Sequence, residues 1–389
     1  MVYVDGIGIV SALGIGVEIN LQALRNHADG IRLIRNFSTA INVPAGELAQ
    51  SNKSLQQILH ISTQHPTSRT SLLGMIAASE AIGNASLTDL SQVAFISATS
   101  VGGMDLTPTF YAQYMHNEQR GKLRYVVQHD CASSTNAIAE YCHIGGFRTA
   151  ISTACSSATN AIMMGARLIE NGLVSTAIVG GTDALCAYTI DGFKSLMILD
   201  SNKCRPFDAS RAGLNLGEGA AYLVLSNKPS THTLCALTGW GNANDAFHQT
   251  AVSTEGTGPQ LSMLSALNKA QLSSSAISYI NAHGTGTPNN DASEATAIRS
   301  IWTSDVPTFS STKAFTGHTL AAAGAIEAVF SVLAIKHQQA WGNLNFAQPM
   351  PEQPTLIPLR QTTSATINHV LSNSFGFGGN CSSVIFSRL

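Results

Sequence analysis

The chain has 389 residues, with 21 Lys or Arg against 23 Asp or Glu, so its net charge is −2. Charged residues are 11% of the sequence, less than half of the roughly 25% that is usual in globular domains. Hydrophobic residues make up 44%, which excludes a disordered chain. The absence of a basic excess argues against a nucleic-acid-binding protein. So few charges predict that much of the surface is hidden, in a large core or against a partner subunit.

The cysteines and the N-terminus bear on the compartment. The seven cysteines form no C-x-x-C pair and no Cys/His ligand spacing, so we expect neither disulfides nor a metal site, and a reducing cytoplasm. They are Cys131, Cys142, Cys155, Cys186, Cys204, Cys235 and Cys381. The opening MVYVDGIGIV has no basic region, so we expect no signal peptide. The uncharged stretch 149–166 contains too many Ser, Thr and Asn residues for a membrane span.

Taken in chain order, the predicted strands describe an internal repeat. Short Val/Ile-rich strands, typical of strands buried on both faces, alternate with helical segments and predict an α/β fold. The first copy of the repeat comprises strands within 2–14, 93–103, 147–157, 175–185 and 220–226. The second copy comprises strands within 234–246, 277–287, 306–318, 369–380 and 382–388. We therefore expect two similar halves, residues 1–230 and 231–389, although chance similarity of short apolar strands is the alternative.

In each copy the third strand runs into a central helix. Apolar residues recur at helical spacing after Cys155, and Asn171-Gly172 supplies a helix stop. Residues 320–337 are almost wholly apolar or small, with Glu327 as their only acid. Such a helix is buried in the centre of a large protein. Glu327 then needs a partner, and Lys313 is the nearest candidate along the chain.

Three side chains stand where chemistry is expected. Cys155 lies where a strand turns into a helix, and the helix N-terminus stabilises a thiolate; an inert buried cysteine is the alternative. His283 precedes a glycine-rich turn, and His318 stands at the entry of the second central helix. Each could be a structural histidine, but their matched positions in the second half favour a site opposite Cys155. The segment 374–380 has Gly residues whose N–H groups could donate to an oxyanion.

Together, five motifs resemble those of the β-ketoacyl-acyl carrier protein synthases, the elongating condensing enzymes of the thiolase superfamily. The motifs are STACSS (152–157), RPFDASRAGLNLGEGA (205–220), NAHGTGTPNND (281–291), SSTKAFTGHTLAAAGAIEA (310–328) and NSFGFGGN (373–380). The opening VDGIGIVSALG is similar as well, so the resemblance spans essentially the whole chain. It implies the five-layered αβαβα thiolase fold, built from two pseudo-repeated halves.

The resemblance also implies a role for each site residue. Cys155 would take an acyl chain from a carrier-protein thioester, and His283 and His318 would stabilise the enolate formed when malonyl-carrier protein loses carbon dioxide. Lys313 and Glu327 would order the site. The remaining positions are the oxyanion-hole N–H groups of Cys155 and Phe377, the gate Phe377, the pantetheine contacts Thr285 and Thr287, and the substrate contacts Phe375 and Gly378. No resident cofactor is expected, because the phosphopantetheine arm is carried by the acyl carrier protein.

Alternatives to a condensing enzyme remain in the same superfamily. A non-catalytic chain-length-factor subunit would lack the nucleophile, and a coenzyme A-dependent thiolase would use a second cysteine as base. The chain departs from the family pattern G-F-G-G-T-N by placing Asn380 and Cys381 after Gly379, and its region 104–146 matches poorly. A dedicated pathway, such as one for an aryl polyene or another polyketide-like lipid, is therefore an alternative to ordinary fatty-acid elongation.

The expected partners are an acidic acyl carrier protein and a second synthase subunit, in a homodimer or a heterodimer, with no nucleic acid and no membrane. Basic residues should bind the carrier protein. The candidates are Arg69, Arg120, Lys122, Arg124 and Lys203.

Overall fold

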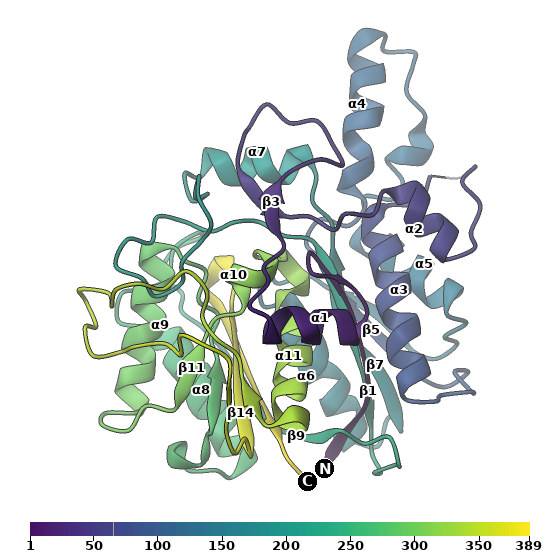
Figure 1. Cartoon of the computed structure of the whole chain (residues 1–389). Coiled ribbons are helices and arrows are strands. Elements are labelled where there is room, and N and C mark those ends of the chain that lie inside the picture. The colour runs from purple at the N-terminus through teal and green to yellow at the C-terminus, as the bar shows by residue number, and fades with distance from the viewer. Residues whose placement is uncertain (65) are drawn as a thin grey trace.

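The computed structural model describes residues 1–64 and 66–389. A mixed sheet runs through the centre of the molecule (Figure 1). Its strands lie in the order β11 (Thr308–Ser310), β10 (Tyr279–Asn281), β14 (His369–Phe375), β15 (Asn380–Ser387), β9 (Cys235–Asn244), β1 (Val2–Ser11), β8 (Gly219–Ser226), β7 (Thr176–Asp183), β5 (Ala94–Ala98) and β6 (Arg148–Ile151). The short strand β2 (Gly14–Ile15) pairs with β1.

The sheet consists of two half-sheets with one topology. The five strands of each half can be numbered in chain order. Outward from the pairing of β1 with β9, both halves then have the order first, fifth, fourth, second, third. The three innermost strands of each half are antiparallel, and the two outer pairings are parallel. The internal repeat is therefore confirmed strand for strand.

Helices complete five layers. Two helices cover the outer face of the first half-sheet, two lie between the half-sheets, and two cover the outer face of the second (Figure 1). In that order they are α3 (Arg69–Asn84) and α5 (Cys131–Tyr141), α6 (Ser157–Glu170) and α11 (Ala323–His337), and α8 (Thr257–Ala270) and α9 (Pro288–Ile301). This is the αβαβα thiolase arrangement that the sequence predicted.

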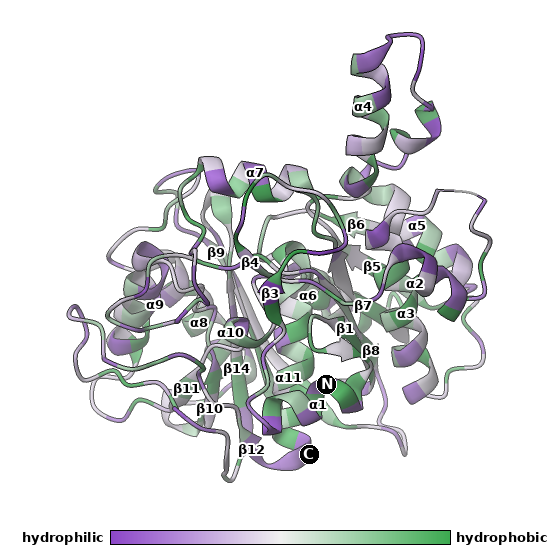
Figure 2. Cartoon of the chain, turned by 45° about the horizontal axis from the view of Figure 1, so that its top comes forward, coloured by the Kyte–Doolittle hydropathy of each residue, from purple (hydrophilic) through white to green (hydrophobic). Residues whose placement is uncertain are grey.

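The two central helices carry the most apolar sequence of the core. Every residue of α11 from Ala323 to Ile335 is buried, and Figure 2 shows the helix mainly in the green of hydrophobic residues. The stretch Leu320–His337 has the length and hydropathy of a membrane span, and 89% of it is buried inside the protein. A helix that packs against both half-sheets has no polar face. The expected buried helix around Glu327 is thus confirmed.

Shorter elements surround this core. They are α1 (Val17–Arg25), β3 (Ile31–Leu33), β4 (Pro44–Gly46), α2 (Asn52–Ile58), α4 (Thr107–His116), α7 (Ala187–Ser195), α10 (Lys313–Thr316), β12 (Gln339–Ala340), β13 (Thr363–Ser364) and five 3₁₀ turns, η1 (Met104–Leu106), η2 (Leu123–Tyr125), η3 (Ser274–Ala276), η4 (Leu320–Ala322) and η5 (Phe377–Gly379). Helix α4 has no buried residue and projects from the body of the molecule (Figures 1 and 2).

One of the expected carrier-binding residues is in the core instead. Arg69 begins α3, and its guanidinium forms a bidentate pair with Glu218, at 2.6 and 2.8 Å. Its other N–H groups donate to the carbonyls of Gln50 and Leu48 and to Asn52. Arg69 is only 4% exposed, so the prediction that it binds a carrier protein is wrong. A buried carboxylate needs such a partner, and Arg69 therefore serves the fold.

Candidate active site

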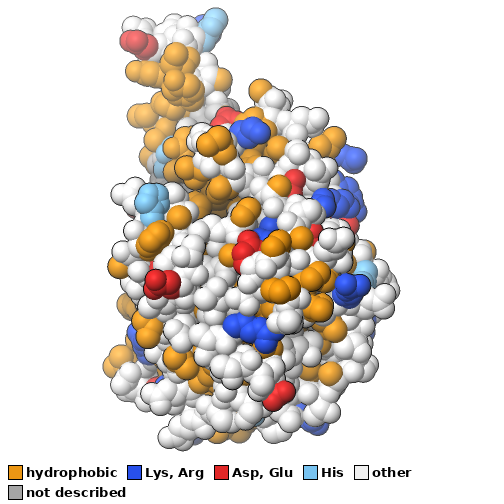
Figure 3. Space-filling model, turned by 90° about the vertical axis from the view of Figure 1, so that its left-hand side faces the viewer, with side chains coloured by type: hydrophobic (Ala, Val, Ile, Leu, Met, Phe, Trp, Pro, Cys, Tyr) orange, Lys and Arg blue, Asp and Glu red, His pale blue; other side chains and the backbone are white. Residues whose placement is uncertain are grey.

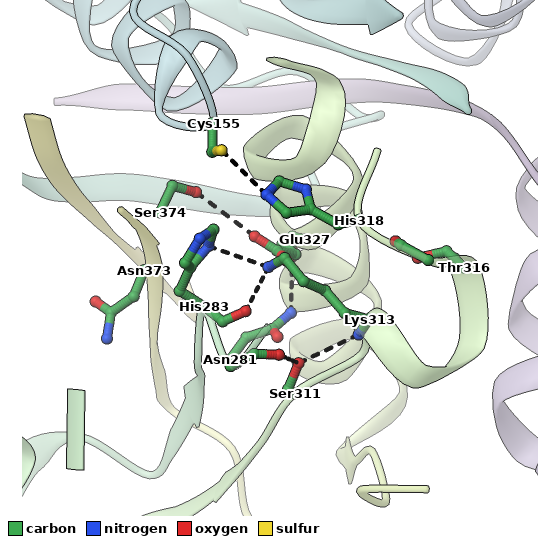
Figure 4. Close-up of polar contacts among 12 residues, drawn as sticks. Cys155, Asn281, His283, Ser311, Lys313, Thr316, His318, Glu327, Asn373 and Ser374 are labelled. Carbon is green, nitrogen blue, oxygen red and sulfur yellow. Dashed lines mark hydrogen bonds and ion pairs between the residues drawn. The ribbon is translucent and has the colours of Figure 1, made fainter. Parts of the chain in front are cut away.

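Cys155 lies in the strained turn between β6 and α6. Ala154, directly before it, has a left-handed φ of 53°, which is uncommon for a residue other than glycine. The turn places Cys155 two residues ahead of the first residue of α6. The side chain is buried, with 6% of the residue exposed, and Figure 4 shows the sulfur pointing toward the two histidines of the second half.

The environment of Cys155 affects its pKa in two directions. Burial is the largest effect and raises the pKa of the thiol to about 11, whereas Lys313 and the N–H of Phe377 lower it. The backbone N–H groups favour the thiolate, as the sequence predicted, but burial has the larger effect on the pKa. Loss of hydration outweighs the dipole in a site this dry. The thiol is therefore neutral at pH 7, and it must lose its proton during the reaction.

This pKa predicts how the reactivity of Cys155 depends on pH. The thiolate fraction should rise about tenfold per pH unit as long as the pH is below the pKa. We therefore expect the rate of alkylation by iodoacetamide to rise about tenfold per unit from pH 7 to 9, without a plateau. Peptide mass spectrometry of alkylated Cys155 measures that rate. A plateau below pH 9 would contradict the raised pKa.

The two histidines reach the sulfur from the second half-sheet. His283 follows β10, and His318 lies between α10 and α11. The His318 Nε2 atom is 3.0 Å from the Cys155 Sγ atom. The two imidazole rings are 5.4 Å apart and nearly perpendicular. The structure thus brings together the three residues that the sequence analysis placed in one site (Figure 4).

Their hydrogen bonds define which nitrogen carries the proton. The Leu320 N–H donates to His318 Nδ1 at 3.2 Å, and the Lys313 ammonium lies 3.1 Å from His283 Nδ1. Because both Nδ1 atoms face donors, each neutral ring carries its hydrogen on Nε2. Burial and the Lys313 charge lower the pKa of both histidines well below the usual value. The site therefore presents two neutral N–H donors.

The same tautomers bear on metal binding. One donor atom from each of Cys155, His283 and His318 lies within 4.8 Å of the others, a set that could suit Zn²⁺. A zinc-bound imidazole usually donates its second N–H to an acceptor. Here the second nitrogens face an N–H and an ammonium instead. The surroundings of this cluster thus favour two hydrogen-bond donors over two metal ligands.

Lys313 and Glu327 form an ion pair beneath the histidines. The Lys313 ammonium contacts the Glu327 carboxylate and the His283 carbonyl, and each of the paired side chains is 2% exposed. Burial raises the pKa of Glu327 to about 7, although Lys313 lowers it. The pairing predicted from the sequence is confirmed. The ammonium holds His283 at two atoms, which orients its ring.

A cavity of about 280 Å³ leads from this cluster to the surface. Thr285 and Thr287, whose hydroxyls are 2.9 Å apart, line it as expected, and so does Phe375. Gly378 is exposed, lies outside the residues that line the cavity, and donates its N–H to the Gln249 carbonyl. A substrate contact at Gly378 stays a prediction. The other wall residues include Phe193, Ile198, Leu214, Val252 and Phe377.

Phe377 lines the cavity beside Cys155. Its ring stacks on Phe193, with centroids 6.0 Å apart, and its backbone N–H approaches the Cys155 sulfur. The preceding Gly376 packs on the nucleophile turn so closely that a Cβ atom there would lie 3.1 Å from the Cys155 nitrogen. The backbones of Cys155 and Phe377 are therefore adjacent, as an oxyanion hole made of both requires.

The sequence analysis missed two buried carboxylates that support the site. Glu294 of α9 accepts the N–H groups of His283 and Gly284, at 2.9 and 2.8 Å. Asp183, at the end of β7, accepts the Ala321 N–H at 2.8 Å and so fixes the turn after His318. No sequence motif marked either acid for this role, because each contacts a histidine loop from another element, α9 or β7. Burial raises the pKa of Glu294 to about 7 and that of Asp183 to about 6.

Comparison with known proteins covers the whole chain. The family models of the beta-ketoacyl synthase N-terminal and C-terminal domains match residues 1–230 and 234–347. The chain is 29% identical to the 3-oxoacyl-[acyl-carrier-protein] synthase 2 of Staphylococcus aureus, over 100% of this chain and 98% of that protein.

Solved structures give the same result. The ishigamide ketosynthase/chain length factor has a TM-score of 0.93 and 28% identity, over 100% of this chain and 99% of that one. The ketosynthase of Xenorhabdus doucetiae, solved in complex with its chain length factor, has a TM-score of 0.88 and 33% identity, over 100% and 98%.

Proposed function

Because the chain belongs to the beta-ketoacyl synthase family of condensing acyltransferases, we propose that Cys155 carries the acyl chain during a decarboxylative Claisen condensation with malonyl-acyl carrier protein. In the first half-reaction the sulfur attacks the thioester carbonyl of an acyl-carrier protein. The carbon–sulfur bond to the carrier breaks, and the carrier leaves as a free thiol with the proton of Cys155.

In the second half-reaction a malonyl-carrier thioester takes the place of the first carrier. Its carboxylate leaves as carbon dioxide, and the electron pair moves into an enolate. The two Nε2–H groups of His283 and His318 stabilise the negative charge on the enolate oxygen. The enolate carbon attacks the acyl-Cys155 carbonyl, whose oxyanion is held by the N–H groups of Cys155 and Phe377. The carbon–sulfur bond then breaks and, after uptake of a proton, restores the thiol.

The main observation behind this proposal is that the Cys155 sulfur lies beside the two neutral N–H donors His283 and His318 in a buried pocket. The test is to incubate the chain with acyl- and malonyl-carrier protein. We expect a β-ketoacyl product and a transient acyl adduct on Cys155 in intact mass, with both absent in Cys155→Ala. An unchanged adduct in that variant would contradict the assignment of the nucleophile.

The same test separates the alternatives. A chain-length-factor role predicts condensation only after a second synthase-like subunit is added, and a thiolase role predicts cleavage of acetoacetyl-coenzyme A without a carrier protein. The intact Cys155–His318 contact favours an active site in this chain. We propose that the reaction needs no resident cofactor, since the carrier protein delivers the phosphopantetheine arm.

We propose that the carrier protein binds through the basic residues that follow α4. Arg120, Lys122 and Arg124 are exposed, whereas the Lys203 ammonium is already engaged by Asp29 at 2.8 Å. Charge reversal of the first three to Glu should raise the KM for the carrier about 5- to 20-fold with little change in kcat, because exposed ion pairs contribute about 0.2–1 kcal/mol each. Steady-state kinetics at low salt measures this. The control is Lys228→Glu, an exposed lysine after β8; equal KM values in all proteins would refute the assignment.

We also propose that the chain works in the cytoplasm as part of a dimer, with a copy of itself or with a related subunit. Strand β6 is a sheet edge, and a free edge is usually covered. The nearby projection exposes hydrophobic side chains, which Figure 3 shows gathered on it. They are Tyr111, Tyr114, Met115, Leu123 and Val127. The likeness to proteins that pair with a chain length factor supports a polyketide-like pathway alongside fatty-acid elongation.

A further inference from the structure

A cluster of polar side chains joins the loop that carries Phe377 to the helix that follows Cys155. We name Gly376–Asn380 the gate loop. At its end, the Asn380 Oδ1 atom accepts hydrogen bonds from Ser156 Oγ at 2.7 Å, Asn160 Nδ2 at 2.9 Å and Asn242 Nδ2 at 3.0 Å. Ser156 directly follows Cys155 in the chain and is fully buried. One side-chain oxygen thus connects the gate loop to the nucleophile turn.

The direction of Asn380 follows from its place in β15. Successive side chains in a strand point to opposite faces. Asn380 and Ser382 face α6, where Ser382 Oγ donates to Asn160 Oδ1 at 2.9 Å. Cys381 faces the other side, with its sulfur against Gly258. The family pattern G-F-G-G-T-N has its asparagine at the Cys381 position. In this chain the asparagine lies one residue earlier, at Asn380, and its side chain therefore faces α6, the helix that follows Cys155.

The rest of the gate loop is held through its backbone and the Phe377 ring: the Gly378 carbonyl accepts the Asn244 side-chain N–H at 3.2 Å, and the Gly379 carbonyl accepts the Asp245 N–H at 2.8 Å. Gly378 and Gly379 both have left-handed φ values, 80° and 81°, which only glycine adopts without strain. The exposed Gly378 is held by backbone hydrogen bonding to Gln249 at 2.7 Å, and Phe377 by ring stacking on Phe193. Asn380 is therefore the side chain through which the loop is bound to the residues beside Cys155.

We propose that Asn380 is a positioning residue that holds the gate loop in a fixed position relative to Cys155, so that the Phe377 N–H stays directed at the reacting carbonyl. This inference rests on the proposed function, because it assigns a task within that reaction. Asn380 does not line the cavity beside Cys155 and acts through the backbone of the loop. Loss of its oxygen would leave the side-chain donors of Ser156 and Asn160 bonded only to Thr153, within the nucleophile turn, and would free the end of the loop.

The test compares Asn380→Ala with Asn380→Asp, which keeps an acceptor oxygen for all three donors. We expect Asn380→Ala to lower kcat for condensation about 10- to 100-fold, as small displacements of oxyanion donors do. The KM for malonyl-carrier protein and the iodoacetamide reactivity of Cys155 should stay within about twofold. Asn380→Asp should recover most of kcat. A matched control is Asn171→Ala, which removes a side-chain bond to Arg167 at the opposite end of α6 and should leave kcat unchanged.

Hydrogen exchange gives a second measure that does not depend on activity. The amides of residues 376–380 should exchange faster in Asn380→Ala than in the wild type, and at the wild-type rate in Asn380→Asp. A wild-type kcat in Asn380→Ala, or an equal loss in Asn171→Ala, would overturn the inference. If the wild type itself forms no acyl adduct, the proposed function fails, and the exchange result still decides whether Asn380 holds the loop.

Discussion

Replacing His283 by alanine is expected to lower the rate of malonyl-carrier decarboxylation about 10²- to 10³-fold, the cost of removing one preorganised oxyanion donor. His283 lies off the sulfur and is held by Lys313, so acylation of Cys155 should remain within about tenfold of the wild type. His318→Ala should impair both steps, because its Nε2 atom is 3.0 Å from the sulfur. Release of labelled carbon dioxide measures the first step, and intact mass the second.

This pair of variants separates two roles that sequence alone treats as equal. His337→Ala, at the far end of α11, is the control and should behave like the wild type in both assays. If His283→Ala blocks acylation as strongly as His318→Ala does, the division of work between the two rings is wrong. If neither variant slows decarboxylation, the enolate is not held by these donors.

Replacing Lys313 by methionine is expected to reduce the free energy of unfolding by about 3–5 kcal/mol, because it leaves the Glu327 carboxylate buried without its partner. The loss should be larger at pH 8 than at pH 5.5. Burial already raises the pKa of Glu327, and removal of the ammonium raises it further. When the pKa of a carboxyl is higher in the folded than in the unfolded protein, the folded protein becomes less stable as the pH rises from the lower pKa to the higher one. Urea unfolding at both pH values measures the effect.

The double variant Lys313→Met/Glu327→Leu distinguishes stability from catalysis. Replacing a buried ion pair by apolar residues is often neutral or stabilising, so most of the stability should return. Condensation should be slow in both variants, because His283 has lost the ammonium that orients its ring. Lys269→Met, which breaks a half-exposed pair with Glu170, should cost at most about 1 kcal/mol. Equal destabilisation in the single and double variants would show that the ammonium matters for packing rather than for charge.

Much of the fold was predictable because its signals are local. Most buried strands are short apolar runs that end in a turn, and the order of these runs repeats, so two similar halves follow. The central helix around Glu327 is apolar on all sides, which already places it between two layers. Cys155, His283 and His318 were found because each lies where a strand end leads into a loop or helix with a distinctive motif.

Other properties depended on neighbours that are distant in sequence. Arg69 looked like a free surface charge, but Glu218, 149 residues away, binds it in the core. The place of Cys155 before a helix predicted stabilisation of its thiolate, yet burial raises the pKa of the thiol by more than the backbone N–H groups lower it. Glu294 and Asp183 support the two histidine loops from other elements, and no motif near them announced that role.

The sequence by itself determined the repeat and the candidate reacting side chains, because periodicity and turn chemistry act within a few residues of each position, and the resemblance of its motifs to a known family implied the layer order. Only the tertiary structure decided which histidine touches the sulfur, which nitrogen carries each proton, and where Asn380 is attached. Those properties arise from contacts between the two halves, across the layer of α6 and α11, and from the loss of water that these contacts cause.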